Sequence, residues 1–255
     1  MPLGFGEGVL LSMGVCAVLS ALAYYRHVLT WDGSVAAFAV GMAIGILGDV
    51  TWLLLLLFFL LSSFLATRYR FALKRAMGVQ EGERGERRSA NVLANGIAPV
   101  AVAILAALEP PWFPRSVSGI VFLSALAVAG ADTLASEIGV LSRRTVLITT
   151  FRQVPPGTNG GISWLGEGAA LAASVYTAVI GILVLAYLAP AVGLVVTMPA
   201  TVLALIIPAV VGFAGCQLDS VLGATLEHRG WLDKKTVNLV ATTAGVFLAF
   251  LFLPI

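Results

Sequence analysis

Long apolar runs, repeated along the whole chain, are the sequence feature that most restricts the fold. A helix needs about 20 residues to cross the roughly 30 Å hydrocarbon layer of a bilayer. Windows that meet this need lie at 8–25, 34–47, 50–66, 91–108, 116–131, 168–188, 194–213 and 237–254. Charged residues make up only 11% of the chain, whereas soluble domains contain about 25%. The sequence therefore predicts an integral membrane protein.

The predicted fold is all-α, a polytopic transmembrane helical bundle of about eight spans. The bundle forms one integral-membrane domain over residues 1–255. The expected location is the cell membrane, as a multi-pass protein. The windows at 34–47 and 50–66 are short, and only Gly48 and Asp49 separate them. If one of the two is re-entrant, the number of spans falls to about seven.

The distribution of Lys and Arg predicts the orientation. With the N-terminus outside, all but Arg115 of the 15 Lys and Arg residues lie in the inner loops, as the retention of basic residues in the cytoplasm requires. The cytoplasmic face then carries a basic loop at 67–90 and a glycine-rich loop region at 132–168. The active site is expected at that face.

Composition also limits the partners. A net charge of +2 is too small to indicate a nucleic-acid partner. The two cysteines, Cys16 and Cys216, are far apart and have no metal-binding spacing, so we interpret both as packing residues.

A first polar group, RRSANVLANG, spans residues 87–96 at the start of a predicted span. Arg88, Asn91 and Asn95 are spaced i, i+3, i+7, which places them on one helical face. A guanidinium and two carboxamides suit an anion or a sugar hydroxyl. The alternative is a capped helix whose Asn side chains bond to a neighbouring helix.

Two acidic groups resemble one another. GADTLASEIG (130–139) places Asp132 with Ser136, and Thr133 with Glu137, on shared helical faces. GCQLDSVLGATLEHRG (215–230) repeats an Asp followed by a hydroxyl residue, at Asp219 and Ser220. Hard oxygen ligands of this kind favour Mg²⁺. The two groups are thus candidate metal-binding corners, and the alternative is acids that are merely hydrated at helix ends.

A glycine-rich stretch, TTFRQVPPGTNGGISWLGEG, spans residues 149–168. Its prolines stop a helix, and its glycines permit the backbone conformations of an anion-binding nest. It contains neither a Walker A motif nor a dinucleotide fingerprint, so a plain surface turn is the alternative. Arg152, Thr158 and Asn159 favour a phosphate loop.

These groups together favour phosphoryl transfer, in which metal ions, backbone amides and cations hold phosphates and neutralise charge. His27 and His228 have no acidic or hydroxyl partner at helical spacing, and no activated Ser, Cys or His nucleophile is visible. Direct transfer to a substrate oxygen is therefore favoured over a covalent intermediate. The apolar surroundings indicate a lipid acceptor.

The strings RxxNVLANG, ADTLASEIG, TTFRQVPPGTNGGIS and GCQLDSVLGAT, in this order, resemble an integral-membrane family, long labelled a domain of unknown function, that includes plant phytyl-phosphate kinase. This family is similar to other membrane CTP-using enzymes, among them phytol and dolichol kinases and, more remotely, phosphatidate cytidylyltransferase. The resemblance covers nearly the whole chain. It implies a CTP-dependent and Mg²⁺-dependent kinase that converts an isoprenyl monophosphate, such as phytyl or geranylgeranyl phosphate, to the diphosphate.

Carried onto this chain, the resemblance implies a set of site residues. The catalytic candidates are Arg88, Asn91, Asn95, Asp132, Glu137, Asp219 and Asn238, of which Asp132, Glu137 and Asp219 are the metal candidates. The nucleotide candidates are Arg152, Pro156, Gly157, Thr158, Asn159, Gly160, Gly161 and Ser220. Glu167, near the loop, would repel a nucleotide, so we expect it to point to solvent.

Two other functions are open at this stage. A membrane cytidylyltransferase that makes a CDP-lipid would use the same metal and the same loop. A lipid or ion transporter or flippase would need polar groups near the midplane with access from both faces. The expected partners are an isoprenyl phosphate, a nucleoside triphosphate and membrane lipids, without nucleic acid, and a homodimer is compatible with the sequence.

Overall fold

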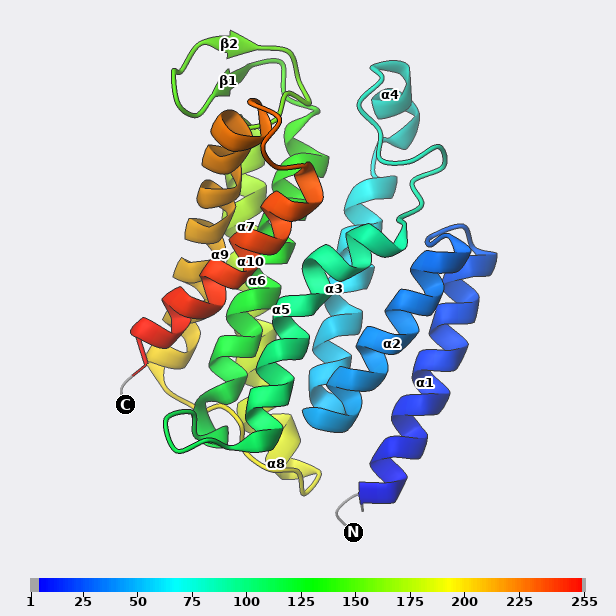
Figure 1. The fold of residues 1–255 in the computed structure, drawn as a ribbon, viewed down its shortest axis with the longest axis vertical. Helices are drawn as coiled ribbons and strands as arrows, with labels where there is room; N and C mark the ends of the chain where they lie inside the picture. The colour runs from blue at the N-terminus through cyan, green and yellow to red at the C-terminus, as the bar shows by residue number, and fades with distance from the viewer. Residues whose placement is uncertain (1–4, 254–255) are drawn as a thin grey trace.

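The structure, a computed structural model, describes residues 5–253 as helices that run back and forth between two ends of a bundle (Figure 1). In chain order the elements are α1 (Phe5–Tyr25), α2 (Trp31–Leu47), α3 (Val50–Arg68), α4 (Phe71–Ala76), α5 (Ser89–Leu108), α6 (Arg115–Gly139), β1 (Thr145–Leu147), β2 (Gln153–Val154), β3 (Gly161–Ile162), α7 (Trp164–Ile182), the π-helical turn η1 (Leu183–Leu188), α8 (Ala189–Ala191), α9 (Val202–Leu222), the π-helical turn η2 (Gly223–Glu227) and α10 (Lys234–Leu251).

The predicted class of fold is confirmed. Six helical segments within residues 5–253 are long and apolar enough to cross a membrane: Gly6–Tyr25, Val50–Arg68, Ser89–Leu108, Arg115–Gly139, Trp164–Ala191 and Val202–Glu227. The apolar helix α2 is shorter, with 17 residues, and α10 begins with two lysines. The roles of α2 and α10 as spans, and the orientation with the N-terminus outside, stay predictions.

The two ends of the bundle differ in composition. We call the end that carries α4, β1 and β2 the polar end, and the end that carries α8 and the start of α1 the opposite end (Figure 1). The connections after α1, α3, α6 and α9, which hold most of the Lys and Arg residues, all lie at the polar end. This is the loop alternation that the positions of the cations predicted.

Polar side chains fix where several helices begin. Thr30, Asp49, Ser163, Thr201 and Asp233 each accept a hydrogen bond from a backbone N–H in the first turn of the helix that follows. Such caps satisfy donors that have no partner inside the helix. Each of these caps therefore defines the first turn of the helix that it precedes.

Helix α6 lies at the centre of the bundle. Every residue from 118 to 131 is buried, and α7, α9 and α10 approach closely through glycines. A Cβ on Gly245 of α10 would lie only 2.6 Å from Val128 Cγ2, and one on Gly212 of α9 only 2.7 Å from Ala127 Cβ. Small residues at these crossings let the backbones pack at short range, as is common in membrane helices. Cys16 and Cys216 are buried and free, as expected of packing residues.

The predicted window at 194–213 is wrong at its start. Residues 194–200 are not helical, and α9 begins at Val202 and continues through η2 to Glu227. Pro199 opposes a helix before it, and the Thr201 cap starts the helix beyond it. The non-helical segment buries Thr197, whose Oγ1 accepts a hydrogen bond of 3.2 Å from Trp52 Nε1.

The two predicted loop regions contain regular structure. The basic loop at 67–90 includes the end of α3, the short helix α4 and the start of α5. In the region 132–168, the first residues belong to α6 and the last to α7, and the middle forms a small antiparallel sheet of order β2-β1-β3. Thr145 pairs with Val154, and Val146 pairs with both Gln153 and Ile162. Backbone pairing makes the glycine-rich segment an ordered part of the polar end.

The close crossing of α6 and α9 leads to a stability prediction. We expect Gly212→Ala to lower the free energy of unfolding by about 1–3 kcal/mol, because the added methyl group overpacks Ala127 and Ser174. Gly14→Ala in α1 is the matched control, since a Cβ there meets nothing within 4 Å. Melting temperatures in detergent measure both. Equal melting temperatures for the two variants would contradict the packing argument.

Candidate active site

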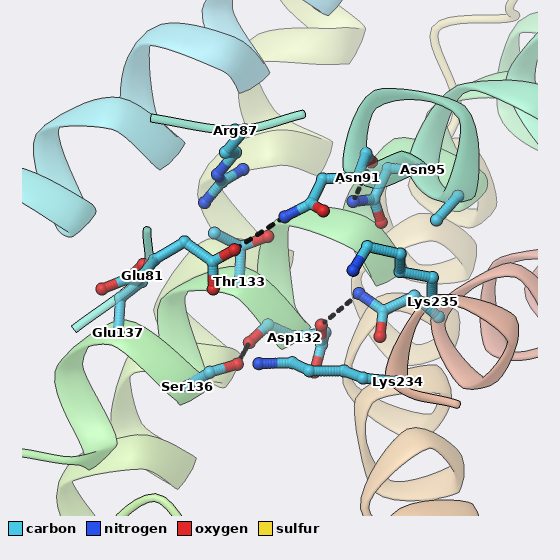
Figure 2. Close-up of a pocket in the computed structure, with 12 residues that line it drawn as sticks. Glu81, Arg87, Asn91, Asn95, Asp132, Thr133, Ser136, Glu137, Lys234 and Lys235 are labelled. Atoms are coloured by element: carbon cyan, nitrogen blue, oxygen red, sulfur yellow. Dashed lines mark hydrogen bonds between the residues drawn. The ribbon is translucent and has the colours of Figure 1, made fainter. Parts of the chain in front are cut away.

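Two polar cavities lie at the polar end of the bundle. The larger one, about 270 Å³, is the loop cavity, and the smaller one, about 70 Å³, is the basic cavity. The loop cavity is lined by residues 157–161, which we call the glycine loop, together with Asp219, Ser220, Gly223, Glu227 and residues 78–81. The basic cavity is lined by Arg87, Asn91, Asn95, Thr133, Lys235 and Asn238 (Figure 2). The two share a wall made of Glu81, Asp132, Ser136, Glu137 and Lys234.

Asp132 of α6 and Asp219 of α9 meet at this wall. Their carboxyl groups lie close enough to share a hydrogen bond if one of them carries a proton. Asn238 of α10 donates from Nδ2 to Asp132 Oδ2 at 3.2 Å, and Lys234 lies within electrostatic range of both acids. The structure thus brings together the two acidic groups that the sequence placed 87 residues apart.

The donor set around this pair fits a hard divalent cation. Asp219 Oδ2 and Asn238 Oδ1 are buried oxygens without a hydrogen-bond donor, a state that native proteins usually avoid. Two carboxylates so close together also repel unless a proton or a cation lies between them. Mg²⁺ commonly binds one or two protein carboxylates and completes its shell with water and phosphate oxygens.

Glu137 does not join the two aspartates as a third metal ligand. Its Oε2 forms an ion pair of 2.6 Å with Lys74 Nζ, and its Oε1 accepts a hydrogen bond of 2.8 Å from Thr67. Within residues 5–253, no group of three or more His, Cys, Asp or Glu side chains is arranged to hold a metal. The sequence places Glu137 on the helical face of Thr133 and not on that of Asp132, and in the structure its carboxylate contacts Lys74 and Thr67.

Lys74 was missed by sequence reasoning. It is fully buried although it belongs to α4 in the basic loop. Besides Glu137, its ammonium group donates to the carbonyl oxygens of Ala66 at 2.8 Å and Thr67 at 3.2 Å. It therefore joins α4 to the C-terminal turn of α3 and to the central helix α6.

The arginine of the first polar group is Arg87 and not Arg88. Arg88 is the N-cap of α5, with extended backbone (φ −89°, ψ 168°), so the helical spacing that grouped it with Asn91 does not apply. Its side chain is exposed and lines neither cavity. Arg87 lines the basic cavity and donates from Nη2 to Thr67 Oγ1 at 3.3 Å. A backbone bridge between Leu29 and Arg87 holds it there.

Asn91 and Asn95 line the basic cavity as expected. Asn91 Nδ2 donates to Glu81 Oε1 at 2.7 Å, and Asn95 Nδ2 donates to the Asn91 carbonyl oxygen at 3.2 Å (Figure 2). Glu81 lies in the irregular segment after α4, where no periodic pattern could have identified it. Its carboxylate orients the Asn91 amide inside the cavity.

The predicted nucleotide loop is brought to the loop cavity only in part. Gly157, Thr158, Asn159, Gly160 and Gly161 line it, as does Ser220. The backbone φ is +83° at Gly157 and +72° at Gly160, the left-handed conformations that the loop was expected to need. Pro156 and Arg152 are not among the lining residues, and Arg152 is exposed just before β2.

The glycine loop packs directly on the π-helical end of α9. A Cβ on Gly160 would overlap the backbone of Ala224, and one on Gly223 would lie 2.9 Å from the Gly160 nitrogen. Asn159 Nδ2 donates to Glu227 Oε1 at 2.6 Å. These contacts place the loop next to Asp219, one turn earlier on the same helix.

Glu167 does not point away from the site. It lines the loop cavity, and its Oε2 accepts a hydrogen bond of 2.7 Å from Gln217 Nε2 of α9. The expectation failed because it considered repulsion by a nucleotide and not the amide partner that α9 supplies. Glu167 and Gln217 join α7 to α9 beside the cavity.

Lys234 and Lys235 supply the cations of the basic cavity together with Arg87. They open α10, whose cap Asp233 accepts from the Thr236 N–H at 2.8 Å. Hydrogen bonds from the side chain and backbone of Thr236 hold the pKa of Asp233 below its usual range, so the cap stays ionised at neutral pH. Lys234 and Asn238 are spaced i, i+4, so they share one face of α10.

Fold and site define a polytopic helical membrane protein with acidic and basic side chains lining two adjoining cavities at one end. The family described as "Integral membrane protein DUF92" matches residues 14–246, and the chain belongs to it. This confirms the family that the sequence motifs resemble. No solved structure matches the chain closely enough to show a relationship.

Three relatives match along most of the chain. The "Uncharacterized membrane protein MJ0933" of Methanocaldococcus jannaschii is 30% identical over 94% of this chain and 92% of its own length. "Protein PGR" of Arabidopsis thaliana is 34% identical over 87% of this chain and 80% of its own length. "Protein VTE6, chloroplastic" of the same plant is 28% identical over 88% of this chain and 65% of its own length.

The Lys74–Glu137 ion pair leads to a prediction that separates it from metal binding. Glu137→Gln leaves the Lys74 charge buried opposite a neutral amide, and we expect the free energy of unfolding to fall by about 3–5 kcal/mol. Glu167→Gln is the control, because the partner of Glu167 is a neutral amide. Thermal melting in detergent without Mg²⁺ measures both variants. An unchanged melting temperature for Glu137→Gln, with an effect only when Mg²⁺ is added, would indicate a metal ligand instead.

Proposed function

We propose that this protein is a membrane kinase that transfers the terminal phosphate of a nucleoside triphosphate to an isoprenyl monophosphate, such as phytyl or geranylgeranyl phosphate, giving the diphosphate. The observation that carries this proposal is the Asp132–Asp219 pair, which lies between a glycine-lined cavity and a cation-lined cavity. This arrangement suits phosphoryl transfer between two phosphorylated substrates, because a metal ion held there would neutralise charge on the transferred group. CTP as the donor is what the family resemblance implies.

The loop cavity is the proposed donor site. Its glycine loop, with Thr158, Ser220 and the close Gly160–Ala224 contact, offers backbone and hydroxyl donors to a polyphosphate. The volume of about 270 Å³ is the larger of the two polar cavities, which fits the larger of the two substrates.

The basic cavity is the proposed acceptor-phosphate site. Arg87, Lys234 and Lys235 can neutralise a phosphate there and also the charge that develops during transfer. A phosphate monoester is already anionic near neutral pH, so its oxygen can attack without a general base. This agrees with the cavity walls, which contain no histidine among the described residues.

Asp132 and Asp219, with the Asn238 oxygen, are the residues that would hold Mg²⁺. When bound, this ion would offset the negative charge of the phosphate groups. In the transfer, an oxygen of the acceptor phosphate forms a bond to the terminal phosphorus of the donor. The bond from that phosphorus to the bridging oxygen breaks, and the nucleoside diphosphate leaves. Lys234 lines both cavities, so its ammonium group can offset negative charge on the donor side and on the acceptor side of the transfer.

The other two functions make different demands on the site. A cytidylyltransferase would need attack at the α-phosphorus, and the same residues could serve it. A transporter needs polar groups that are reached from both faces, whereas the two polar cavities both lie at the polar end. This observation argues against the transporter.

A product analysis tests the kinase directly. Purified protein is incubated with Mg²⁺, geranylgeranyl phosphate and CTP that is radiolabelled in its α-phosphate. Label that appears in CDP, together with unlabelled lipid diphosphate, supports the kinase. Label in a CDP-lipid, together with released pyrophosphate, would overturn it in favour of the cytidylyltransferase.

The aspartate pair leads to a second prediction. Asp132→Asn and Asp219→Asn should each lower the transfer rate by at least about 100-fold, more than is typical for residues that only support a metal ligand. Each should keep or raise the melting temperature without Mg²⁺, because the repulsion between the two acids is relieved. The control is Asp49→Asn at the opposite end, where Asn can still cap α3. Full activity in both site variants would remove the metal assignment.

A further inference from the structure

A small apolar crevice adjoins the basic cavity. It lies between α2, α3 and α5 and is lined by Ala37, Val40, Leu56, Phe59 and Val92. Its apolar surface exceeds its polar surface several-fold, in contrast to both polar cavities. An apolar crevice in direct contact with a cationic cavity is the arrangement that an amphipathic ligand requires.

The crevice and the basic cavity adjoin one another. Arg87, Asn91 and Asn95 line both of them, so these polar groups lie between the two spaces. The other side chains that line the basic cavity are polar except for Ala94, so a hydrocarbon chain attached to an anionic head at Arg87 meets little apolar surface there. The adjoining crevice supplies that surface.

Two small residues, Ala37 on α2 and Gly96 on α5, line the crevice. A Cβ on Gly96 would lie 3.0 Å from Val40 Cγ1, so α5 packs closely on α2 at one side of the crevice. Next to these positions, the same helices carry exposed apolar side chains, Val35 on α2 and Leu93 and Ile97 on α5. A chain that leaves the crevice would therefore continue along apolar surface.

We propose that the crevice holds the hydrocarbon chain of the acceptor next to its phosphate, and that Arg87, Asn91 and Asn95 form the acceptor-phosphate subsite. This inference rests on the proposed kinase function and adds where the acceptor binds. The donor then approaches from the loop cavity, on the other side of the Asp132 wall. The crevice is smaller than either polar cavity, so we infer that the acceptor is a single-chain lipid phosphate and not a diacyl lipid.

The test fills the crevice and compares two acceptors. Ala37→Phe should raise the KM for geranylgeranyl phosphate at least about 10-fold, the loss expected when about one buried apolar group is displaced. The KM for methyl phosphate, which has no hydrocarbon chain to place in the crevice, and the KM for the nucleotide should change little. Ala39→Phe is the matched control, because Ala39 is exposed on the same helix and does not line the crevice.

Arg87→Gln tests the phosphate subsite. The KM for both acceptors should rise together by about 10-fold to 100-fold, as the loss of a charge-assisted hydrogen bond predicts, while the KM for the nucleotide stays unchanged. A rise in the nucleotide KM alone would assign Arg87 to the donor and overturn the subsite.

A separate labelling experiment keeps the proposal falsifiable if Ala37→Phe fails to fold. Wild-type protein is photolysed with a geranylgeranyl phosphate analogue that carries a diazirine on its first isoprene unit. Label on residues 29–60 or 87–96 supports the crevice, and label confined to α7, α9 or α10 overturns it.

The failures of the two proposals are distinguishable. If wild-type protein phosphorylates neither acceptor, the kinase function is wrong. If it phosphorylates both, and Ala37→Phe affects both acceptors equally or neither, the kinase function stands and the crevice assignment is wrong. Competition by a diacyl phosphatidic acid as effective as that by geranylgeranyl phosphate would also overturn the single-chain assignment.

Discussion

The site depends on one contact, in which the carboxyl groups of Asp132 and Asp219 meet between two largely apolar helices. At such a short distance and away from bulk water, like charges repel far more strongly than on an exposed surface. Lys234 and the Asn238 amide offset part of this repulsion. Two buried oxygens still have no donor, and this shortage of positive charge makes the pair a good place for a cation and its phosphate ligands.

The packing of the helices sets the distance between these two acids. Gly212 and Gly215 of α9 face α6 where any side chain would overlap Ala127 or Val128, so the two helices cross closely just below Asp132 and Asp219. On the other side of the wall, Lys74 ties α4 to α3 and to Glu137 of α6. The ion pair is buried, and residues 78–81, which follow α4 in the chain, line the loop cavity. Close packing of α6 and α9 on one side of the two acids, and the Lys74–Glu137 ion pair on the other, thus border a polar space in an apolar bundle.

Sequence reasoning succeeded where a local pattern controls the structure. Apolar windows predicted the helical spans, and the glycine loop predicted positive φ at Gly157 and Gly160. It failed where a helix cap, or a partner distant in the sequence, determines the position of a side chain. Arg88 is the N-cap of α5 and so does not share the helical face of Asn91. Glu137 pairs with Lys74, which lies 63 residues away in the sequence. Arg152 lies in a β-hairpin whose direction depends on strand pairing, which the sequence alone did not predict.

The sequence by itself determined that the chain is a multi-pass membrane protein with its polar residues at helix ends, because insertion into a bilayer depends on apolar length and on the positions of charges, both of which are properties of the linear chain. Only the tertiary structure decided which acids meet, which are neutralised by ion pairs, and which cation faces the cavity. Those outcomes depend on the rotation and crossing of helices, which small residues such as Gly212 permit through contacts between segments far apart in sequence.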